Sequence, residues 1–323
     1  MHYNLQYVPV VNAAAGVLSS CFANRDRIIA VDHITVATVN PECWDLIFVL
    51  CAETTFKIRS HLDRLGSRLV LIHTSDEPGL EKYNRFFFPH WLFCVSEVND
   101  SNKVHDRYIR PSYSYNALMG RAKDSRTQLL MQLDNRNLLE HGIIGYRPGN
   151  YYTPPVKINP TAYYNGIWKF EERELRELYS HEINYLTGFD STTRLTTGHF
   201  SSCLIPWEVY DNSSVTVVCE TDNHGSHSFV TEKTWKPLLA RHPVIFYATR
   251  QHENFLERLG FEIYVKTSGD PTIVADILED FTKTKSKYDY YQWGEKFSHN
   301  RDLCCIISWR KRFHQWLHEN FVN

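Results

Sequence analysis

The sequence lacks the features that would mark a membrane, secreted or metal-rich protein. No apolar run approaches the roughly 18 residues that a membrane span needs, and residues 1–20 lack the basic leader and long apolar core of a signal peptide. The 8 cysteines include no Cys-x-x-Cys pair. We therefore expect a globular cytoplasmic protein without a membrane span, whose thiols are reduced and mostly buried and form no metal site.

The sequence also lacks a strong charge and the common phosphate-binding motifs. A net charge of −2 supplies no overall attraction for nucleic acid, so such a partner would need a local basic patch. Neither Gly-x-Gly-x-x-Gly nor Gly-x-x-x-x-Gly-Lys occurs, and there is no Asp-x-Asp to hold a divalent ion on a diphosphate. At 323 residues, with 43% hydrophobic side chains, the chain can build two modest cores.

The most informative stretch is 214–265. A β-branched run at 215–218 ends at Glu220, and a polar loop at 222–228 and a helical segment follow. Because Pro237 cannot sit deep in a helix, 231–236 is expected to be a capped first turn or a kink. A strand at 244–247, a helix at 252–259 that Gly260 stops, and a strand at 261–265 complete a β-α-β-α-β pattern. This pattern predicts a parallel sheet with right-handed crossovers.

Charged residues fall where the strands of this unit end. Ligands of such sheets bind outside the carboxyl ends of the strands, where helix N-termini favour anions. Glu220, Glu232 and Lys233 lie at that edge. A carboxylate can accept hydrogen bonds from the vicinal hydroxyls of a ribose, and an ammonium can neutralise a diphosphate. The stretch thus indicates a nucleotide-diphosphate site, the alternative being that Glu232 and Lys233 are solvated helix charges.

The string FVTEKTWKPLLARHPVIF, preceded by VVCET, carries a family resemblance. It resembles the donor-binding region of GT-B glycosyltransferases related to the α1,3-fucosyltransferases, and more closely that of small glycosyltransferases encoded by tailed phages and large DNA viruses. The resemblance extends over about fifty residues. It implies that Glu232 grips the nucleotide ribose, that Lys233 faces the phosphates, and that Glu220 and Thr231 line the same pocket. If a virus encodes the chain, the compartment would be the host cytoplasm.

A second basic segment precedes this unit. We predict a strand at 112–116, a loop with Gly120 and a helix at 124–139 that Gly142 terminates. Arg121 and Arg126 fall in the loop and first turn, which is a phosphate-binding position, although an exposed arginine pair is the alternative. The family resemblance implies that Asn116 and Arg126, and less firmly Arg121, belong to the donor site.

The first part of the chain is predicted to be a smaller α/β unit. Its expected strands are two short pieces within 27–39, then 46–51, 68–73 and 86–95, with a helix at 56–65. Asp32 lies within 27–39, and Glu53 follows the strand at 46–51. Asp76 and Glu77 lie in the turn HTSDEPG, which begins at the end of the strand at 68–73. These four carboxylates are the candidates for a base that takes a proton from an acceptor hydroxyl.

Together these features predict an α/β protein of GT-B architecture, with two Rossmann-like parallel-sheet domains facing a cleft. The expected domains are an acceptor-side domain at 1–109, a donor-binding domain at 110–290 and C-terminal helices at 291–323 that cross back onto the first domain. Further helices are expected at 271–282 and 308–321. Residues 145–160 are expected to form a loop whose Tyr151 and Tyr152 either contact substrate or pack on their own domain.

The predicted activity is transfer of a sugar from a nucleotide-diphosphate sugar, of UDP or GDP type, to a hydroxyl acceptor without an obligatory cofactor or metal. The acceptor is a glycan or glycoprotein, or hydroxymethylated pyrimidine in phage DNA. For DNA the relevant basic residues would be Lys57, Arg59, His61, Arg64, Arg68, Arg107, Arg110, Arg121 and Lys123. The alternatives are a non-catalytic nucleotide- or glycan-binding module of the same fold and another nucleotide-using α/β enzyme. The oligomeric state and an inverting or retaining course stay open.

Overall fold

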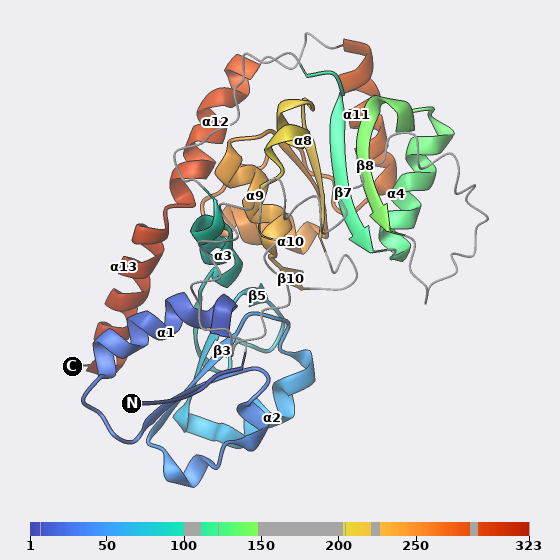
Figure 1. The fold of residues 1–323 in the computed structure, drawn as a ribbon. Coiled ribbons are helices and arrows are strands. Elements are labelled where there is room, and N and C mark those ends of the chain that lie inside the picture. The colour runs from blue at the N-terminus through green and yellow to red at the C-terminus, as the bar shows by residue number, and fades with distance from the viewer. Residues whose placement is uncertain are drawn as a thin grey trace.

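A computed structural model describes residues 1–6, 8–99, 111–121, 123–147, 203, 205–220, 227–284 and 290–322. Over these residues the protein is α/β, with a five-stranded and a four-stranded parallel sheet whose faces are covered by helices (Figure 1). None of the helices in these ranges is long and apolar enough to cross a bilayer.

The first sheet is entirely parallel and has the strand order β1-β2-β3-β4-β6. Its strands are β1 (His2–Asn4), β2 (Ile28–Asp32), β3 (Leu46–Cys51), β4 (Leu69–His73) and β6 (Asn84–Phe87). Strands β2 and β4 are buried along their whole length because both faces of the sheet are covered, and they are apolar up to Asp32 and His73, which end them. In β3, for example, Phe48 and Leu50 enter one core, while Ile47 and Val49 enter another.

Helices from both ends of the chain cover the first face of this sheet. They are α1 (Val8–Phe22), α3 (His90–Val98) and α13 (Ile306–Leu317), which lies alongside α1 and continues into a π-helical turn at His318–Val322 (Figure 1). Phe313 of α13 stacks on Phe86 of β6 with ring centroids 5.0 Å apart. On the other face α2 (Arg59–Leu65) packs with short 3-10 turns. The chain therefore ends on the unit with which it begins.

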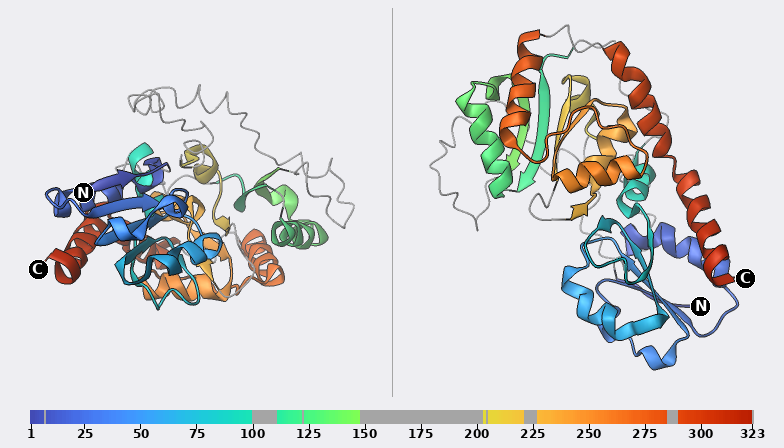
Figure 2. Two further views of the ribbon diagram at one scale, coloured as in Figure 1. Left: turned by 90° about the horizontal axis from the view of Figure 1, so that it is seen from below. Right: turned by 180° about the vertical axis from the view of Figure 1, so that it is seen from behind.

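The second sheet is also parallel, with the order β11-β9-β7-β8. Its strands are β11 (Val244–Tyr247), β9 (Thr216–Cys219), β7 (Tyr115–Arg121) and β8 (Gly142–Arg147). On one face α4 (Asp124–Asn135) packs beside α11 (Pro271–Thr284), as Figure 2 shows from behind. The other face carries α8 (Trp207–Asp211), α9 (Glu232–Ala240) and α10 (Arg250–Arg258), with α12 (Tyr290–Leu303) against α9.

A two-stranded antiparallel ladder joins the two sheets. It pairs β5 (Ser75–Asp76), just beyond the end of β4, with β10 (Ser228–Phe229), which precedes α9. Helix α3 also packs on α9, so a continuous apolar core runs from the first sheet to the second. The ladder holds the turn after β4 next to the segment that leads into α9.

The predicted strand at 86–95 is wrong beyond its first two residues. The strand β6 ends at Phe87, and α3 begins at His90 after Pro89. Proline supplies no N–H to a sheet ladder, and it suits the start of a helix. A short run that is apolar on all sides does not distinguish a buried strand from a buried helix, and here the segment is the helix that packs on α9.

The predicted strand at 261–265 is also wrong, so the β-α-β-α-β unit contributes only β9 and β11 to the sheet. Asn300 of α12 accepts from the backbone N–H of Glu262 at 2.8 Å and donates to its carbonyl at 2.9 Å. These two bonds satisfy the backbone groups that a neighbouring strand would otherwise pair. The segment is therefore tied to a helix and not to the sheet.

Part of the predicted loop at 145–160 is strand, because β8 runs to Arg147. Its first residue, Gly142, lies opposite Tyr115 of β7, and a Cβ at this position would stand 2.2 Å from the Tyr115 ring. The glycine thus permits close packing inside the sheet. The predicted helix at 124–139 ends earlier than expected, since α4 stops at Asn135 and Gly142 follows the 3-10 turn Leu139–His141. Between 27 and 39 only β2 is a strand, and Val36–Thr38 forms a 3-10 turn. The rest of the loop, with Tyr151 and Tyr152, lies outside the described residues.

Candidate functional site

The start of α9 is held by Glu220, which follows the end of β9. Thr231 caps the helix by accepting from the backbone N–H of Lys233, and its own hydroxyl donates to Glu220 Oε2 at 2.6 Å. Glu220 Oε1 accepts from the backbone N–H of Thr231 at 3.1 Å and from the hydroxyl of Thr234 at 2.6 Å. Glu220 is 1% exposed, so this carboxylate positions the helix from beneath instead of facing a ligand.

Glu232 and Lys233 occupy the first turn of α9 and form an ion pair. Lys233 Nζ lies 2.7 Å from Glu232 Oε1, and the two side chains keep 20% and 11% of their surface exposed. Burial disfavours the charged form of both groups. The positive charges of Lys233 and Lys236 outweigh burial and lower the pKa of Glu232. The negative charges of Glu232 and Glu220 outweigh burial and raise the pKa of Lys233. The pair is therefore charged at neutral pH and reaches solvent at the helix N-terminus.

Arg126 lies next to this pair, although it is distant in sequence. It is in the first turn of α4 and is 3% exposed, and its Nη2 donates to the carbonyls of Cys219 and Glu220 at 3.2 and 3.5 Å. The positive charge of Arg126 is near enough to Lys233 to act on its pKa, which it lowers against the larger opposite effect of Glu232. Two cations thus converge at the carboxyl end of β9, beside the N–H groups that begin α9.

Asn116 is at the opposite end of the sheet from these residues. It pairs in register with Thr216, the first residue of β9, and its Nδ2 donates to the Thr216 and Ser213 hydroxyls at 2.8 and 2.7 Å. Four residues of strand separate Thr216 from Glu220, about 13 Å. The structure therefore does not bring Asn116 to the predicted donor site. Arg121 ends β7 at the carboxyl edge, and its side chain lies outside what the structure describes.

Behind the ion pair lies a buried polar network that the sequence did not reveal. Thr234 contacts His252 Nε2 at 3.4 Å, and His252 Nδ1 contacts the Ser228 hydroxyl at 2.9 Å. Burial lowers the pKa of His252, which keeps the ring neutral. Because Ser228 lies in the ladder with β5, this network connects the start of α9 to the junction between the sheets. No spacing in the sequence links Ser228, Thr234 and His252, since they meet only through the fold.

At the edge of the first sheet Glu77 is a structural carboxylate, which is at odds with its predicted role as a base. Its oxygens accept from the backbone N–H and hydroxyl of Thr55 at 2.7 and 2.6 Å and from the Ser75 hydroxyl at 2.5 Å. Arg59 Nη2 adds an ion pair at 3.3 Å. The side chain has no exposed surface, so a substrate has no access to it.

Asp76 and Asp32 are also engaged by the protein. Asp76 forms an ion pair with Arg258 of α10, across the junction between the sheets, and keeps 18% of its side chain exposed. Asp32 is fully buried, and its carboxylate accepts from the backbone N–H groups of Ile34 and Thr35 at 3.0 and 2.9 Å. Both residues therefore order the chain after a strand.

Glu53 is the half-buried carboxylate of this edge. It follows the end of β3, and its charge acts on the buried thiol of Cys51 together with those of Glu77 and Asp32. The carboxyl edge of the first sheet thus gathers the acidic residues that the sequence predicted there. Among them Glu53 combines a place at that edge with partial exposure.

Three of the arginines proposed for a DNA contact are bound within the protein. Arg59 donates to Glu77 and to the carbonyl of Pro78, and Arg64 donates to the carbonyl of Val39 at 3.0 Å. Arg68 lies 3.3 Å from Glu42. Arg107 and Arg110 lie outside the described residues. The described part of the patch therefore consists largely of residues that stabilise the first unit.

Comparisons with known proteins identify no relative. No family model matches the chain, and neither the curated proteins nor the solved structures contain a match. Function is therefore argued from the geometry of the site.

Proposed function

We propose that the protein is a glycosyltransferase of GT-B architecture, which moves a sugar from a nucleotide-diphosphate sugar to a hydroxyl acceptor. The observation that carries the proposal is the charged pair Glu232 and Lys233 at the start of α9, with Arg126 beside it. A carboxylate next to two cations at the positive end of a helix suits a ligand with a diol at one end and a diphosphate at the other. A UDP or GDP sugar has that pattern.

The junction between the sheets supports the GT-B part of the proposal. The ladder of β5 and β10 joins the turn after β4 to the segment before α9, and both lie at the carboxyl edges of their sheets. The two edges therefore meet at this ladder, which is where a donor and an acceptor would have to approach each other. Helix α13 packs back on α1 and α3, an arrangement that the same architecture would use to couple its two halves.

Each residue has a defined role in the proposed transfer. Glu232 accepts hydrogen bonds from the ribose hydroxyls, Lys233 faces the diphosphate, and the buried Arg126 contributes its positive charge from beneath. Glu53 takes the proton of the acceptor hydroxyl as its oxygen forms a bond to the anomeric carbon. The bond from that carbon to the diphosphate breaks, and its electron pair leaves with the diphosphate, whose charge the two cations stabilise. The direct displacement inverts the anomeric configuration.

For the acceptor, the structure favours a glycan or glycoprotein over hydroxymethylated DNA. DNA binding requires cations that are free to meet phosphates along the backbone. Arg59, Arg64 and Arg68 instead each direct one terminal nitrogen to the protein's own carbonyls or carboxylates, which limits their freedom to meet a phosphate. We therefore propose a neutral hydroxyl acceptor at the edge that carries Glu53.

The second candidate is a nucleotide- or glycan-binding module without catalysis. It is favoured by the buried, hydrogen-bonded state of Asp32 and Glu77 and by the ion pair of Asp76, because these contacts leave fewer carboxylates available to act as a base. The two candidates differ in the role of Glu53. A module would tolerate its loss, whereas a transferase would bind its donor normally and lose turnover.

The proposal is tested by thermal shift with a panel of nucleoside diphosphates and their sugars. A ligand that binds the native state raises Tm with its concentration. We expect one nucleotide to stabilise the native protein, and the Glu232→Ala and Lys233→Ala variants to lose the effect. The exposed pair Glu257 and Lys266, 2.8 Å apart, supplies matched controls, since Glu257→Ala and Lys266→Ala should keep it. If no nucleotide shifts the native protein, the donor site is refuted. Binding without sugar transfer to any glycan would favour the module.

A further inference from the structure

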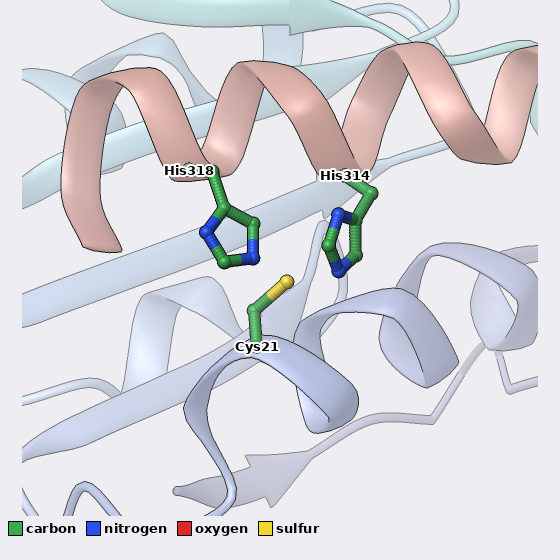
Figure 3. A group of neighbouring side chains, drawn as sticks. All are labelled: Cys21, His314 and His318. Carbon is green, nitrogen blue, oxygen red and sulfur yellow. The ribbon is translucent and has the colours of Figure 1, made fainter. Parts of the chain in front are cut away.

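A second cluster of reactive side chains lies where the two ends of the chain meet. Cys21 is in the last turn of α1, and His314 and His318 are on the C-terminal helix. All three side chains point into the space between these helices, as Figure 3 shows. One ligand atom from each residue, the sulfur and a nitrogen of each ring, lies within 4.8 Å of the others. The proposed sugar transfer uses none of them.

The spacing is close to that of a metal site. Zinc bonds of about 2.0–2.3 Å in a tetrahedron place the ligand atoms about 3.5 Å apart. The observed upper limit of 4.8 Å thus requires the side chains to close by about 1 Å, which rotation about their χ angles provides. The two rings already lie side by side, with centroids 4.5 Å apart. Cys21 and His318 are half-buried and His314 is exposed, so an ion can enter from solvent.

The backbone also favours a cation at this place. His314 and His318 are four residues apart, so they share one face of the helix, and this spacing is one that zinc proteins use. His318 is where α13 ends and the π-helical turn begins. Cys21 lies in the last turn of α1, and the last carbonyls of a helix carry partial negative charge, which stabilises a positive ion nearby. The two histidines and the end of α1 thus converge on the same point.

We propose that Cys21, His314 and His318 bind a zinc ion, with water as the fourth ligand, and that this ion fastens the C-terminal helix to α1. A thiolate and two imidazoles suit zinc and other soft or borderline ions, whereas magnesium and calcium prefer oxygen. Binding converts the Cys21 thiol into a zinc thiolate and releases its proton to solvent. No electron transfer is involved, so the step needs no oxidant or reductant.

The position of the ion makes it structural and independent of the proposed sugar transfer. Helix α1 runs from the carboxyl end of β1 back to the amino end of β2, so Cys21 lies at the amino edge of the first sheet. Glu53 and the junction with β10 lie at the carboxyl edge. Helix α13 follows α12 in the chain, and α12 packs on α9 of the second unit. The ion would therefore hold the C-terminal helix, which comes from the second unit, on the first unit.

Zinc affinity of the full-length protein tests the proposal. The protein is stripped with a chelator and titrated with Zn²⁺ against a chromophoric competitor, and Co²⁺ then reports the ligands through its thiolate charge-transfer band. We expect one equivalent of tightly bound zinc. Cys21→Ser, His314→Gln and His318→Gln should each weaken binding about 100-fold or more, since even residues that only support a metal ligand contribute 10–100-fold. Cys43→Ser and His61→Gln, at an exposed thiol and a histidine outside the cluster, should leave it unchanged.

Hydrogen exchange supplies a readout that does not depend on the metal chemistry alone. Zinc should slow amide exchange over 306–322 and 8–22 in the native protein and not in the His314→Gln variant. His314 is exposed, so this variant folds. Absence of stoichiometric zinc, a cobalt complex without the thiolate band, or affinity that survives all three substitutions would each overturn the proposal. Failure of the zinc experiments would leave the Tm shift with nucleotide, and its loss in the Glu232→Ala and Lys233→Ala variants, unaffected.

Discussion

Replacing Glu77 with glutamine should destabilise the protein and leave its chemistry intact. The substitution preserves the size of the side chain, but it removes the charge and turns one acceptor oxygen into a donor. Glu77 sits between Thr55, Ser75 and Arg59, and none of its side chain is exposed. The variant therefore separates a structural role from a role in proton transfer.

The size of the effect follows from the four donors that meet Glu77. If the amide oxygen takes the place of Oε1, it keeps the Thr55 N–H and Ser75 hydroxyl bonds, and the Thr55 hydroxyl can turn to accept from the new amide group. The ion pair with Arg59 is lost, and the remaining bonds become neutral. A charged hydrogen bond contributes about 1.5–3 kcal/mol and a neutral one about 1 kcal/mol, so the lost ion pair and the three weakened bonds together should make unfolding easier by about 3 kcal/mol or more.

Urea unfolding followed by far-ultraviolet circular dichroism measures this change, with equal m-values required for the comparison. Glu81→Gln, at an exposed carboxylate four residues on, is the matched control and should leave the midpoint in place. Nucleotide binding and sugar transfer, assayed well below the melting temperature, should be normal in both variants. A Glu77→Gln protein of native stability that has lost transfer would refute the structural assignment and restore Glu77 as the base.

Three further predictions follow from the same contacts. Glu53→Gln should lower sugar transfer about 10²–10⁴-fold at unchanged nucleotide affinity, as measured by initial rates and by calorimetry; normal rates would exclude Glu53 as the base. Asn300→Ala should cost about 1–2 kcal/mol in urea unfolding, because both backbone bonds to Glu262 are lost, and an unchanged midpoint would show that water replaces them. Burial lowers the pKa of His73 to about 4 and of His90 to about 3, so the unfolded chain takes up protons first as the pH falls. As the pH falls from about 6.5 to about 4, the free energy of unfolding should therefore decrease by about 1.4 kcal/mol per pH unit for each histidine. A flat pH profile would contradict this.

The sequence predicts the buried parallel strands well, because their composition is decisive. The expected 46–51 and 244–247 coincide with β3 and β11, and the expected helix at 271–282 lies within α11. Strands covered on both faces are continuously apolar and end in polar residues, which leaves little ambiguity. The prediction of an α/β fold with parallel sheets is thereby confirmed.

Two of the wrong predictions depend on a partner that is remote in sequence. The backbone of Glu262 in 261–265 pairs with Asn300, and Gly142 pairs with Tyr115 of β7. Local pattern contains neither contact. The segment after Pro89 failed for a related reason, because a fully buried helix and a fully buried strand have the same composition.

In the candidate site too, positions set by local sequence could be predicted and contacts between remote residues could not. Thr231, Glu232 and Lys233 are adjacent in sequence, so their place at a helix N-terminus could be predicted, and Glu220 falls beside them because β9 leads to that edge. The hydrogen-bond partners of Glu77 and Asp76 could not be predicted, since they come from other elements. In the proposed metal site, the four-residue spacing of His314 and His318 can be read in the sequence, but only the fold brings Cys21 to them.

The most direct test of the donor site is a calorimetric double-mutant cycle between protein and ligand. The nucleoside diphosphate selected by thermal shift is titrated beside its dideoxy analogue and its monophosphate into the native, Glu232→Ala and Lys233→Ala proteins. We expect that Glu232→Ala weakens binding of the ribonucleotide and not of the dideoxy analogue, and that Lys233→Ala weakens binding of the diphosphate and not of the monophosphate. Equal losses for every ligand, or no losses, would contradict the assignment of ribose to Glu232 and diphosphate to Lys233.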